Sequence, residues 1–244
     1  MNLKNKVALV TGGAKRVGKT IALALAERGA HVAVHYRSSK SEAEKTAREI
    51  QALGVKAKIY KADLTRVPQL KKMVETISKQ LGPVDILINS ASIYEETPLS
   101  TLQEKNWNAH IDTNLKGAFF LAKFCAVTML KRKTGKIINI IDSDIHHPYN
   151  HYLPYMVSKS GLAGLTVCLA RELAPHIQVN GISPGPVLMQ PDWDKTVLED
   201  IIKVTPLSRI GHPQDIANGV LFCLEGTDFM TGAIIPIDGG QHIA

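Results

Sequence analysis

The stretch that decides the fold is residues 7–18, VALVTGGAKRVG, in which an apolar run leads directly into a glycine-bearing turn. Val7 to Val10 has the composition of a buried strand, and a helical pattern follows the turn. A strand that passes through glycines into a helix presents the backbone N–H groups of the first helical turn to one point in space. Because those groups and the helix dipole attract anions, we expect the turn to receive a pyrophosphate.

The same alternation continues along the chain, since short apolar runs suited to strands are separated by longer helical patterns. This order predicts a parallel sheet with crossover helices. The expected strands are 7–10, 31–35, 57–60, 86–88, 136–141, 178–182 and 234–237, and the first expected helices are 21–28, 41–53 and 68–81. Gly29 and Gly54 should end the first two helices, and Ser41 with Glu44 should form a capping box. We predict one α/β domain over residues 1–244, with a mobile substrate flap around 185–204.

Composition and charge argue against several classes of protein. The chain has no extended apolar run after its first positive charges, and we expect a cytoplasmic protein that binds no membrane. The net charge is +7, but basic and acidic residues are interleaved and no series of aromatics accompanies them, so we expect no nucleic-acid partner. Cys125, Cys168 and Cys223 lie far apart in apolar segments, which favours three buried thiols and no metal site.

The residues at the end of the second expected strand favour NADP(H) over NAD(H). Tyr36, Arg37 and Ser38 stand where a site for NAD would ordinarily carry an acidic residue that binds the ribose hydroxyls. A guanidinium beside hydroxyl groups suits a ribose phosphate instead. The alternative is that Arg37 is an ordinary solvated loop residue.

Tyr155 and Lys159 form the candidate catalytic pair. Their spacing of four residues at the start of an expected helix puts the phenol and the ammonium on one face. The cation is expected to lower the pKa of the phenol from about 10 towards neutrality, so that it can exchange a proton during hydride transfer. Such a pair also arises by chance in many helices, so the rest of the chain has to support it.

A series of motifs resembles the short-chain dehydrogenase/reductase family in order and spacing. They are Thr11-Gly12 with Gly18, Asn89-Ser90-Ala91-Ser92, Asn114, the Tyr155/Lys159 pair, Ser183-Pro184-Gly185 and Asp238-Gly239-Gly240. The resemblance covers essentially the whole chain, and it implies a Rossmann-like, doubly wound sheet of seven parallel strands, usually assembled into a homotetramer.

The resemblance also implies roles for single residues. Asp63 should face the adenine, Asn89 should hold the backbone near the cofactor, and Asn114 should support a proton-relay water beside Lys159, as a fourth member of the catalytic set with Asp142. The expected cofactor contacts are Gly12, Arg16, Val17, Gly18, Tyr36, Arg37, Ser38, Asp63, Leu64, Asn89, Ala91, Ser92, Lys159, Pro184 and Gly185.

Two residues depart from the general pattern of that family. Arg16 stands where most members carry the middle glycine of the turn, and its guanidinium can reach both pyrophosphate and substrate. Asp142, 13 residues before Tyr155, stands where a catalytic serine usually sits, while Ser143 should point to the opposite face. A serine hydroxyl can donate to a ketone oxygen, whereas an ionised aspartate cannot, so a different substrate is implied.

With Ser92 and Tyr94, these departures resemble the pteridine reductases of the family, in which an aromatic at the position of Tyr94 covers one face of the pterin. Asp142 could accept from the N–H groups of that ring or help to protonate it. The expected substrate contacts are Arg16, Ser92, Tyr94, Asp142, Tyr155, Pro186, Leu188 and Trp193, and no role is assigned to His146 or His147.

The predicted activity is the NADPH-dependent reduction of a dihydropterin or dihydrofolate to its tetrahydro form. One alternative is an NADPH-dependent reductase of a carbonyl or a 3-oxoacyl thioester, because one scaffold supports many substrates. A second is an NADPH-sensing or scaffold protein without turnover. At the level of single residues, Asp142 could instead cap a loop at the end of its strand, and Tyr94 could pack on its own loop.

Overall fold

A computed structural model describes residues 1–188 and 195–244 and contains one sheet of seven parallel strands. The strands are β1 (Val7–Val10), β2 (His31–Tyr36), β3 (Ala57–Lys61), β4 (Ile86–Asn89), β5 (Gly135–Ile140), β6 (Ile177–Pro184) and β7 (Ile234–Ile237). Their order across the sheet is β3-β2-β1-β4-β5-β6-β7, so the chain winds outwards from β1 in one direction and then from β4 in the other. The predicted fold class, a Rossmann-like doubly wound sheet, is confirmed.

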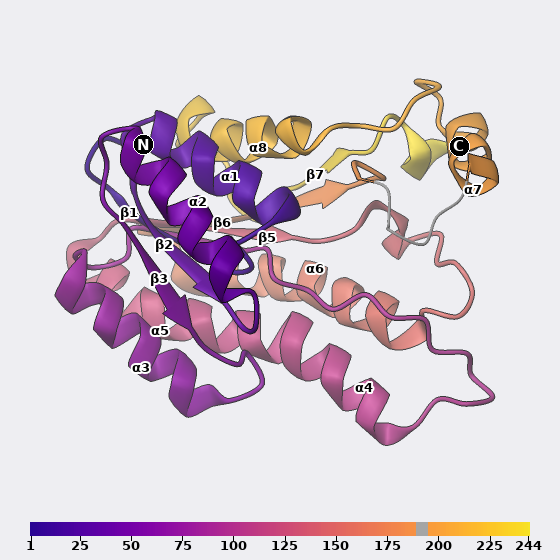
Figure 1. Cartoon of the computed structure of the whole chain (residues 1–244), viewed down its shortest axis with the longest axis horizontal. Coiled ribbons are helices and arrows are strands. Elements are labelled where there is room, and N and C mark those ends of the chain that lie inside the picture. Colours follow the sequence, from indigo (N-terminus) through magenta and orange to yellow (C-terminus); the bar gives the residue numbers. More distant parts are fainter. Residues whose placement is uncertain (189–194) are drawn as a thin grey trace.

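Helices cover both faces of this sheet (Figure 1). One face packs against α1 (Arg16–Glu27), α2 (Lys40–Ala52) and α8 (Pro213–Leu221), and the other against α3 (Val67–Gln80), α5 (Gly117–Arg132) and α6 (Leu153–Leu173). The remaining elements are α4 (Glu104–His110), α7 (Lys195–Val204), the π-helical turns η1 (Ile111–Lys116) and η3 (Phe222–Gly226), and the 3₁₀ turns η2 (Ser143–Ile145) and η4 (Gln241–Ile243).

Neighbouring residues of each central strand enter opposite halves of the core. Leu9 and Leu87 pack with α3, α5 and α6, whereas Val10 and Ile88 pack with α1, α2 and α8. Both faces of these strands are therefore buried. This is why they appear in the sequence as continuous apolar runs rather than as alternating ones.

The ends of α1 and α2 test the predicted start and stop signals. Gly29 and Gly54 follow the two helices with φ of +84° and +83°, as expected of residues that end a helix in the left-handed conformation. The predicted capping box is wrong, because α2 starts at Lys40 and Ser41 already lies inside the helix. Glu44 forms an ion pair with Lys40 at 3.6 Å instead.

The flap predicted around 185–204 stays a prediction. Its second half is the helix α7, and residues 189–194, which include Trp193, lie outside the described residues. The expectation of three buried thiols needs correction, because Cys125 and Cys223 are buried but Cys168 is exposed. It lies on α6, which has apolar residues around its whole circumference, so an apolar neighbourhood in the sequence does not reveal which side faces the core.

Helix α6 is long and apolar enough to cross a membrane by length and composition, with a mean hydropathy of 1.2. In the folded chain, 56% of that stretch is buried, and the helix packs against β6 and η1. Tyr155 and Lys159 lie in its first two turns, among the buried residues. The buried part of this apolar helix belongs to the core of the folded chain.

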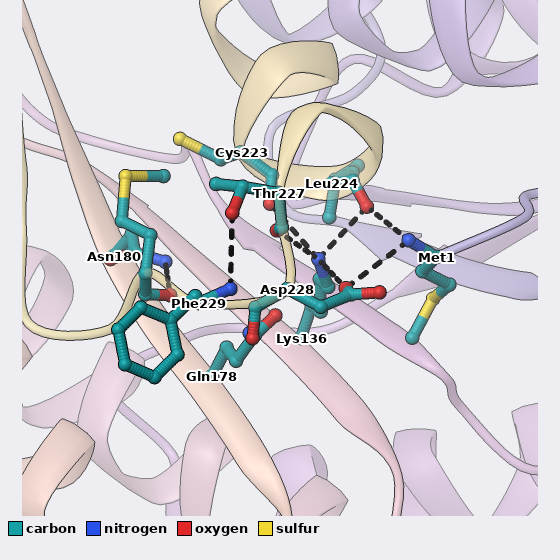
Figure 2. A network of polar contacts seen from close by, with 10 residues as sticks. Met1, Lys136, Gln178, Asn180, Cys223, Leu224, Thr227, Asp228 and Phe229 are labelled. Carbon is teal, nitrogen blue, oxygen red and sulfur yellow. Dashed lines mark hydrogen bonds and ion pairs between the residues drawn. The ribbon is translucent and has the colours of Figure 1, made fainter.

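The amino end of the sheet is closed by a network around Lys136, the second residue of β5 (Figure 2). Its buried ammonium donates to the carbonyl oxygens of Cys223, Leu224 and Thr227 and forms an ion pair of 2.8 Å with Asp228. These carbonyls lie at the end of α8 and η3, where a helix leaves acceptors unpaired and its dipole is negative. Lys136 therefore fixes the segment before β7, at the edge opposite the cleft described next.

Candidate active site

A cleft of about 1160 Å³ opens at the carboxyl ends of the strands. Strand order reverses between β1 and β4, and ligands of doubly wound sheets bind at such a switch point. The predicted site residues that line the cleft are Gly12, Arg16, Val17, Gly18, Tyr36, Arg37, Ser38, Asp63, Leu64, Ala91, Ser92, Tyr94, Asp142, Tyr155, Lys159, Pro184, Gly185, Pro186 and Leu188. Residues that lie far apart in the sequence thus line the same cleft.

The turn between β1 and α1 is packed so closely that side chains cannot enter it. Gly12 has φ +65°, and a Cβ on Gly18 would lie 2.4 Å from the carbonyl oxygen of Gly12. The Thr11 hydroxyl accepts hydrogen bonds from the backbone N–H groups of Ser90 and Ala91 at 2.9 and 3.0 Å, which joins the turn to the end of β4. Arg16 adopts φ +55°, a conformation that glycine takes more easily.

The cleft extends from this turn to the end of β2. Arg37 and Ser38 line it there, and so does Asp63, which follows the neighbouring strand β3. Although burial opposes ionisation, hydrogen bonds from Thr65 and the charges of Arg37 and Arg66 lower the pKa of Asp63. A helix N-terminus at one end and a guanidinium with hydroxyls at the other fit a dinucleotide that carries a ribose phosphate.

The phenol, the ammonium and the carboxyl group expected at the catalytic centre do meet in the cleft. The Tyr155 hydroxyl donates to Oδ2 of Asp142 at 2.6 Å. Oδ1 of Asp142 accepts from the backbone N–H of Asp144 at 2.9 Å, which holds the carboxylate in place. The Lys159 ammonium donates to the carbonyl oxygen of Ile140 at 2.8 Å and lies 5.6 Å from the centre of the Tyr155 ring. Asp142 does cap the η2 turn, but it also binds the phenol.

The expected effect of Lys159 on the phenol is wrong for this structure. Burial and then the charge of Asp142 raise the pKa of Tyr155 well above its usual value. Burial also raises the pKa of Asp142, against the hydrogen bond from Tyr155, and lowers that of Lys159 to about 8. Burial and the charge of Asp142 dominate, so the hydroxyl keeps its proton at neutral pH.

Two predicted site residues, Asn89 and Asn114, are the ones in the described part of the chain that do not line the cleft. Asn114 lies in η1, where its Oδ1 accepts from the N–H of Ile93 at 2.9 Å and its Nδ2 donates to Ser158 Oγ at 3.0 Å. Asn89 donates to Oδ1 of Asn139 within the sheet at 2.8 Å. Both side chains therefore support the wall of the cleft from behind.

Tyr94 belongs to a cluster of four tyrosines that the sequence analysis missed. Its ring stacks on Tyr152 with the centroids 4.5 Å apart, and forms a T-shaped pair with Tyr155 with the centroids 4.8 Å apart. Tyr149 lies 6.3 Å away and also lines the cleft. The repeat of tyrosine at every third position from 149 to 155 was a signal for an aromatic wall. Tyr94 thus packs against another segment rather than on its own loop.

Asp144 and His147 are further lining residues without a predicted role. Burial and the charges of Asp142 and Asp238 raise the pKa of Asp144 to about 6. A second carboxyl group therefore lies on the wall that carries Asp142. Ser143, as expected, points away from the cleft into a buried position. Among the described residues, no cluster of three His, Cys, Asp or Glu side chains could hold a metal ion.

Comparison with known proteins identifies the class to which this fold and site belong. The sequence profile of the short chain dehydrogenase family matches residues 6–199, and the chain is a member of that family of oxidoreductases. The 3-oxoacyl-(acyl-carrier-protein) reductase FabG of Staphylococcus epidermidis is 37% identical over 98% of this chain and 100% of its own length. The corresponding FabG of Thermotoga maritima is 33% identical over the full length of both chains.

A solved structure with the same fold comes from Brucella canis. It is FolM alternative dihydrofolate reductase 1, complexed with NADP, and it is 33% identical to this chain with a TM-score of 0.93. The match covers 100% of this chain and 96% of that one. The relatives thus include reductases of two substrate types.

Proposed function

We propose that the protein is an NADPH-dependent reductase that reduces a C=N bond of a dihydropterin or dihydrofolate ring to the tetrahydro form. The observation that carries this proposal is the 2.6 Å hydrogen bond from Tyr155 to Asp142. It puts a carboxylate at the place where the family usually offers a serine hydroxyl. The NADP complex of the Brucella canis dihydrofolate reductase adds support from a relative of the same fold.

The cofactor would lie along the cleft from the β1–α1 turn to Tyr155. Gly12, Arg16 and Val17 would hold the pyrophosphate at the start of α1, while Arg37 and Ser38 would bind the ribose phosphate. Lys159 would bind the ribose of the nicotinamide. When bound, NADPH supplies the hydride.

Tyr155 would supply the proton. Its raised pKa keeps the hydroxyl protonated at neutral pH, so the hydroxyl can pass its proton to a ring nitrogen that gains negative charge. The Lys159 ammonium stabilises the resulting phenolate, and its pKa of about 8 makes it a suitable group to return a proton. Asp142 would accept hydrogen bonds from the amino and ring N–H groups of the substrate, which orients the ring.

Residues around this centre suit a flat substrate. Tyr94, which stacks on Tyr152, lines the cleft together with Arg16 and Ser92. A planar heterocycle gains stacking energy from an aromatic wall, whereas a flexible acyl chain does not. Pro186 and Leu188 would close the pocket from the segment after β6.

A second candidate is the reduction of a 3-oxoacyl thioester, which is what the FabG relatives are named for. Besides Tyr155, the family usually offers a serine hydroxyl as a second donor to the ketone oxygen, and at that place Asp142 acts as an acceptor. The carboxylate therefore disfavours this substrate. A protein that binds NADPH without turnover is the third candidate, and any steady consumption of NADPH would exclude it.

We also propose a homotetramer located in the cytoplasm. Helices α5 and α6 expose the apolar side chains of Phe119, Val127, Leu130, Val157 and Val167. Apolar area of this kind on neighbouring helices marks a contact surface for another protein, and a second copy of the chain is the partner that the family suggests. The mass of the assembly in light scattering tests this.

The substrate test follows NADPH absorbance with dihydrobiopterin, dihydromonapterin, dihydrofolate and an acetoacetyl thioester at equal concentration. We expect turnover with at least one of the three pteridines and a lower kcat/KM with the thioester. Turnover of the thioester alone would establish the second candidate instead. No consumption of NADPH with any substrate would favour the third.

A further inference from the structure

His35 joins two loops on the adenosine side of the cleft. It lies on β2, is 2% exposed, and its Nδ1 is 3.2 Å from the backbone nitrogen of Gly12. Its Nε2 is 3.1 Å from the carbonyl oxygen of Ala62, just after β3. A backbone N–H can only donate and a carbonyl can only accept. The two contacts together therefore require a neutral imidazole with its hydrogen on Nε2.

The contact to Gly12 lies past the last residue pair of the β1–β2 ladder. Strands β1 and β2 are in register from Val7 with His31 up to Val10 with Val34, and the ladder ends there. Gly12 lies two residues further on, with its left-handed φ of +65°. Across this gap the His35 side chain connects β2 to the turn that starts α1.

The charge state of His35 suits this role. Burial lowers the pKa of His35 to about 4, although the Ala62 carbonyl and the charge of Asp63 oppose it. Nδ1 is therefore an acceptor at neutral pH. A protonated ring would carry a hydrogen on Nδ1, which would face the N–H of Gly12 and break the contact.

We propose that His35 is a positioning residue for the cofactor, which fixes the β1–α1 turn through the N–H of Gly12 and anchors it to the segment that leads into Asp63. This inference rests on the proposed binding of NADPH and is independent of the substrate. His35 acts before chemistry begins. Its loss should therefore weaken NADPH binding and leave turnover at saturating NADPH unchanged.

Two variants separate this role from a general effect on folding. In His35→Asn, the amide oxygen takes the place of Nδ1 and keeps an acceptor for Gly12, while the contact to Ala62 is lost. His35→Leu has a similar size and keeps neither contact. Tyr60→Phe is the matched control. Tyr60 is a buried residue of the adjacent strand β3 that does not line the cleft, and the substitution removes its 3.1 Å hydrogen bond to Gln80.

The experiment measures the Kd of NADPH by calorimetry without substrate, the kcat at saturating NADPH, and the exchange rate of the Gly12 amide by NMR. For His35→Leu we expect a Kd about tenfold higher, the effect of one lost hydrogen bond near the upper end of its usual range. The Gly12 amide should exchange faster, and kcat should not change. His35→Asn should restore most of the affinity, and Tyr60→Phe should match the wild type.

Wild-type affinity in His35→Leu would overturn the inference, and so would an equal loss of affinity in His35→Asn and His35→Leu. If His35→Leu proves too unstable, the ratio of Kd between His35→Asn and Tyr60→Phe decides, with a value near one expected and a tenfold loss contradicting the role. A wild-type protein that binds no NADPH would contradict the proposed function itself. That result can be told apart from the failure of this inference alone, in which the wild type binds NADPH tightly and substitution of His35 leaves the Kd unchanged.

Discussion

At the scale of single residues, burial and then the charge of Asp142 set the pKa of the catalytic phenol. Lys159 lies close to Tyr155, yet the pKa of the phenol is raised, because the ring is buried and Asp142 accepts its hydrogen bond. The pairing of these residues could be predicted from spacing on a strand and a helix. The sign of the pKa shift could not, since it depends on how completely the fold excludes water from the three groups.

Lys159 should produce a pH limit on turnover. Burial lowers its pKa to about 8, so the ammonium that stabilises the phenolate is lost as pH rises through that value. We expect kcat to be flat from pH 6.5 to 7.5 and to fall about tenfold per pH unit well above 8. The Lys159→Arg variant stays protonated, so its pH profile should lack this limb whatever its absolute rate. A wild-type profile that is level up to pH 10 would contradict the assignment.

His35 should contribute to stability in a pH-dependent way. Its pKa is lowered from 6.5 to about 4 in the fold, so the unfolded chain takes up the proton first as pH falls. The contribution is complete above pH 6.5 and is lost progressively down to pH 4, with a total of about 3 kcal/mol.

Urea unfolding of wild type and His35→Asn at several pH values measures this contribution. The carboxyl groups of Asp142 and Asp144, whose pKa values are raised, are common to both proteins and cancel in the difference. The stability advantage of the wild type should shrink between pH 6.5 and 4. A constant difference would show that the imidazole is not held neutral.

At the scale of elements, the strands could be predicted well and the contacts between loops could not. Burial on both faces makes each central strand a continuous apolar run, which is visible in the sequence. The stacking of Tyr94 on Tyr152 joins segments that are far apart in the chain, and no local sequence pattern predicts this contact. The start of α2 was misplaced because Ser41 resembles an N-cap, whereas the helix already begins at Lys40.

The β1–α1 turn should tolerate no side chain at Gly18. A Cβ there would lie 2.4 Å from the Gly12 carbonyl oxygen, so Gly18→Ala must open the turn, at a cost of about 1–3 kcal/mol of unfolding free energy. NADPH affinity should fall with it. Gly164→Ala is the matched control, because a Cβ at Gly164 of α6 meets no described atom within 4 Å and alanine favours a helix. Equal melting temperatures for the two variants would refute this account of the turn.

At the scale of the whole molecule, the two ends of the sheet have different tasks. The amino end is fixed by Lys136 and its carbonyl partners (Figure 2), and the carboxyl end carries the cleft. Residues of the cleft can therefore be substituted at the carboxyl end without loss of the fold. Asp142 lies at that end, in a chain that is 37% identical to a FabG.

The most direct test of the account compares Asp142→Ser with the wild type on two substrates, dihydrobiopterin and an acetoacetyl thioester. The serine would restore a donor to a ketone oxygen and remove the acceptor for ring N–H groups. We expect kcat/KM for the pteridine to fall by about 100-fold and that for the thioester to rise. Unchanged pteridine turnover in Asp142→Ser, or a wild type that prefers the thioester, would contradict the central claim that Asp142 selects a pteridine.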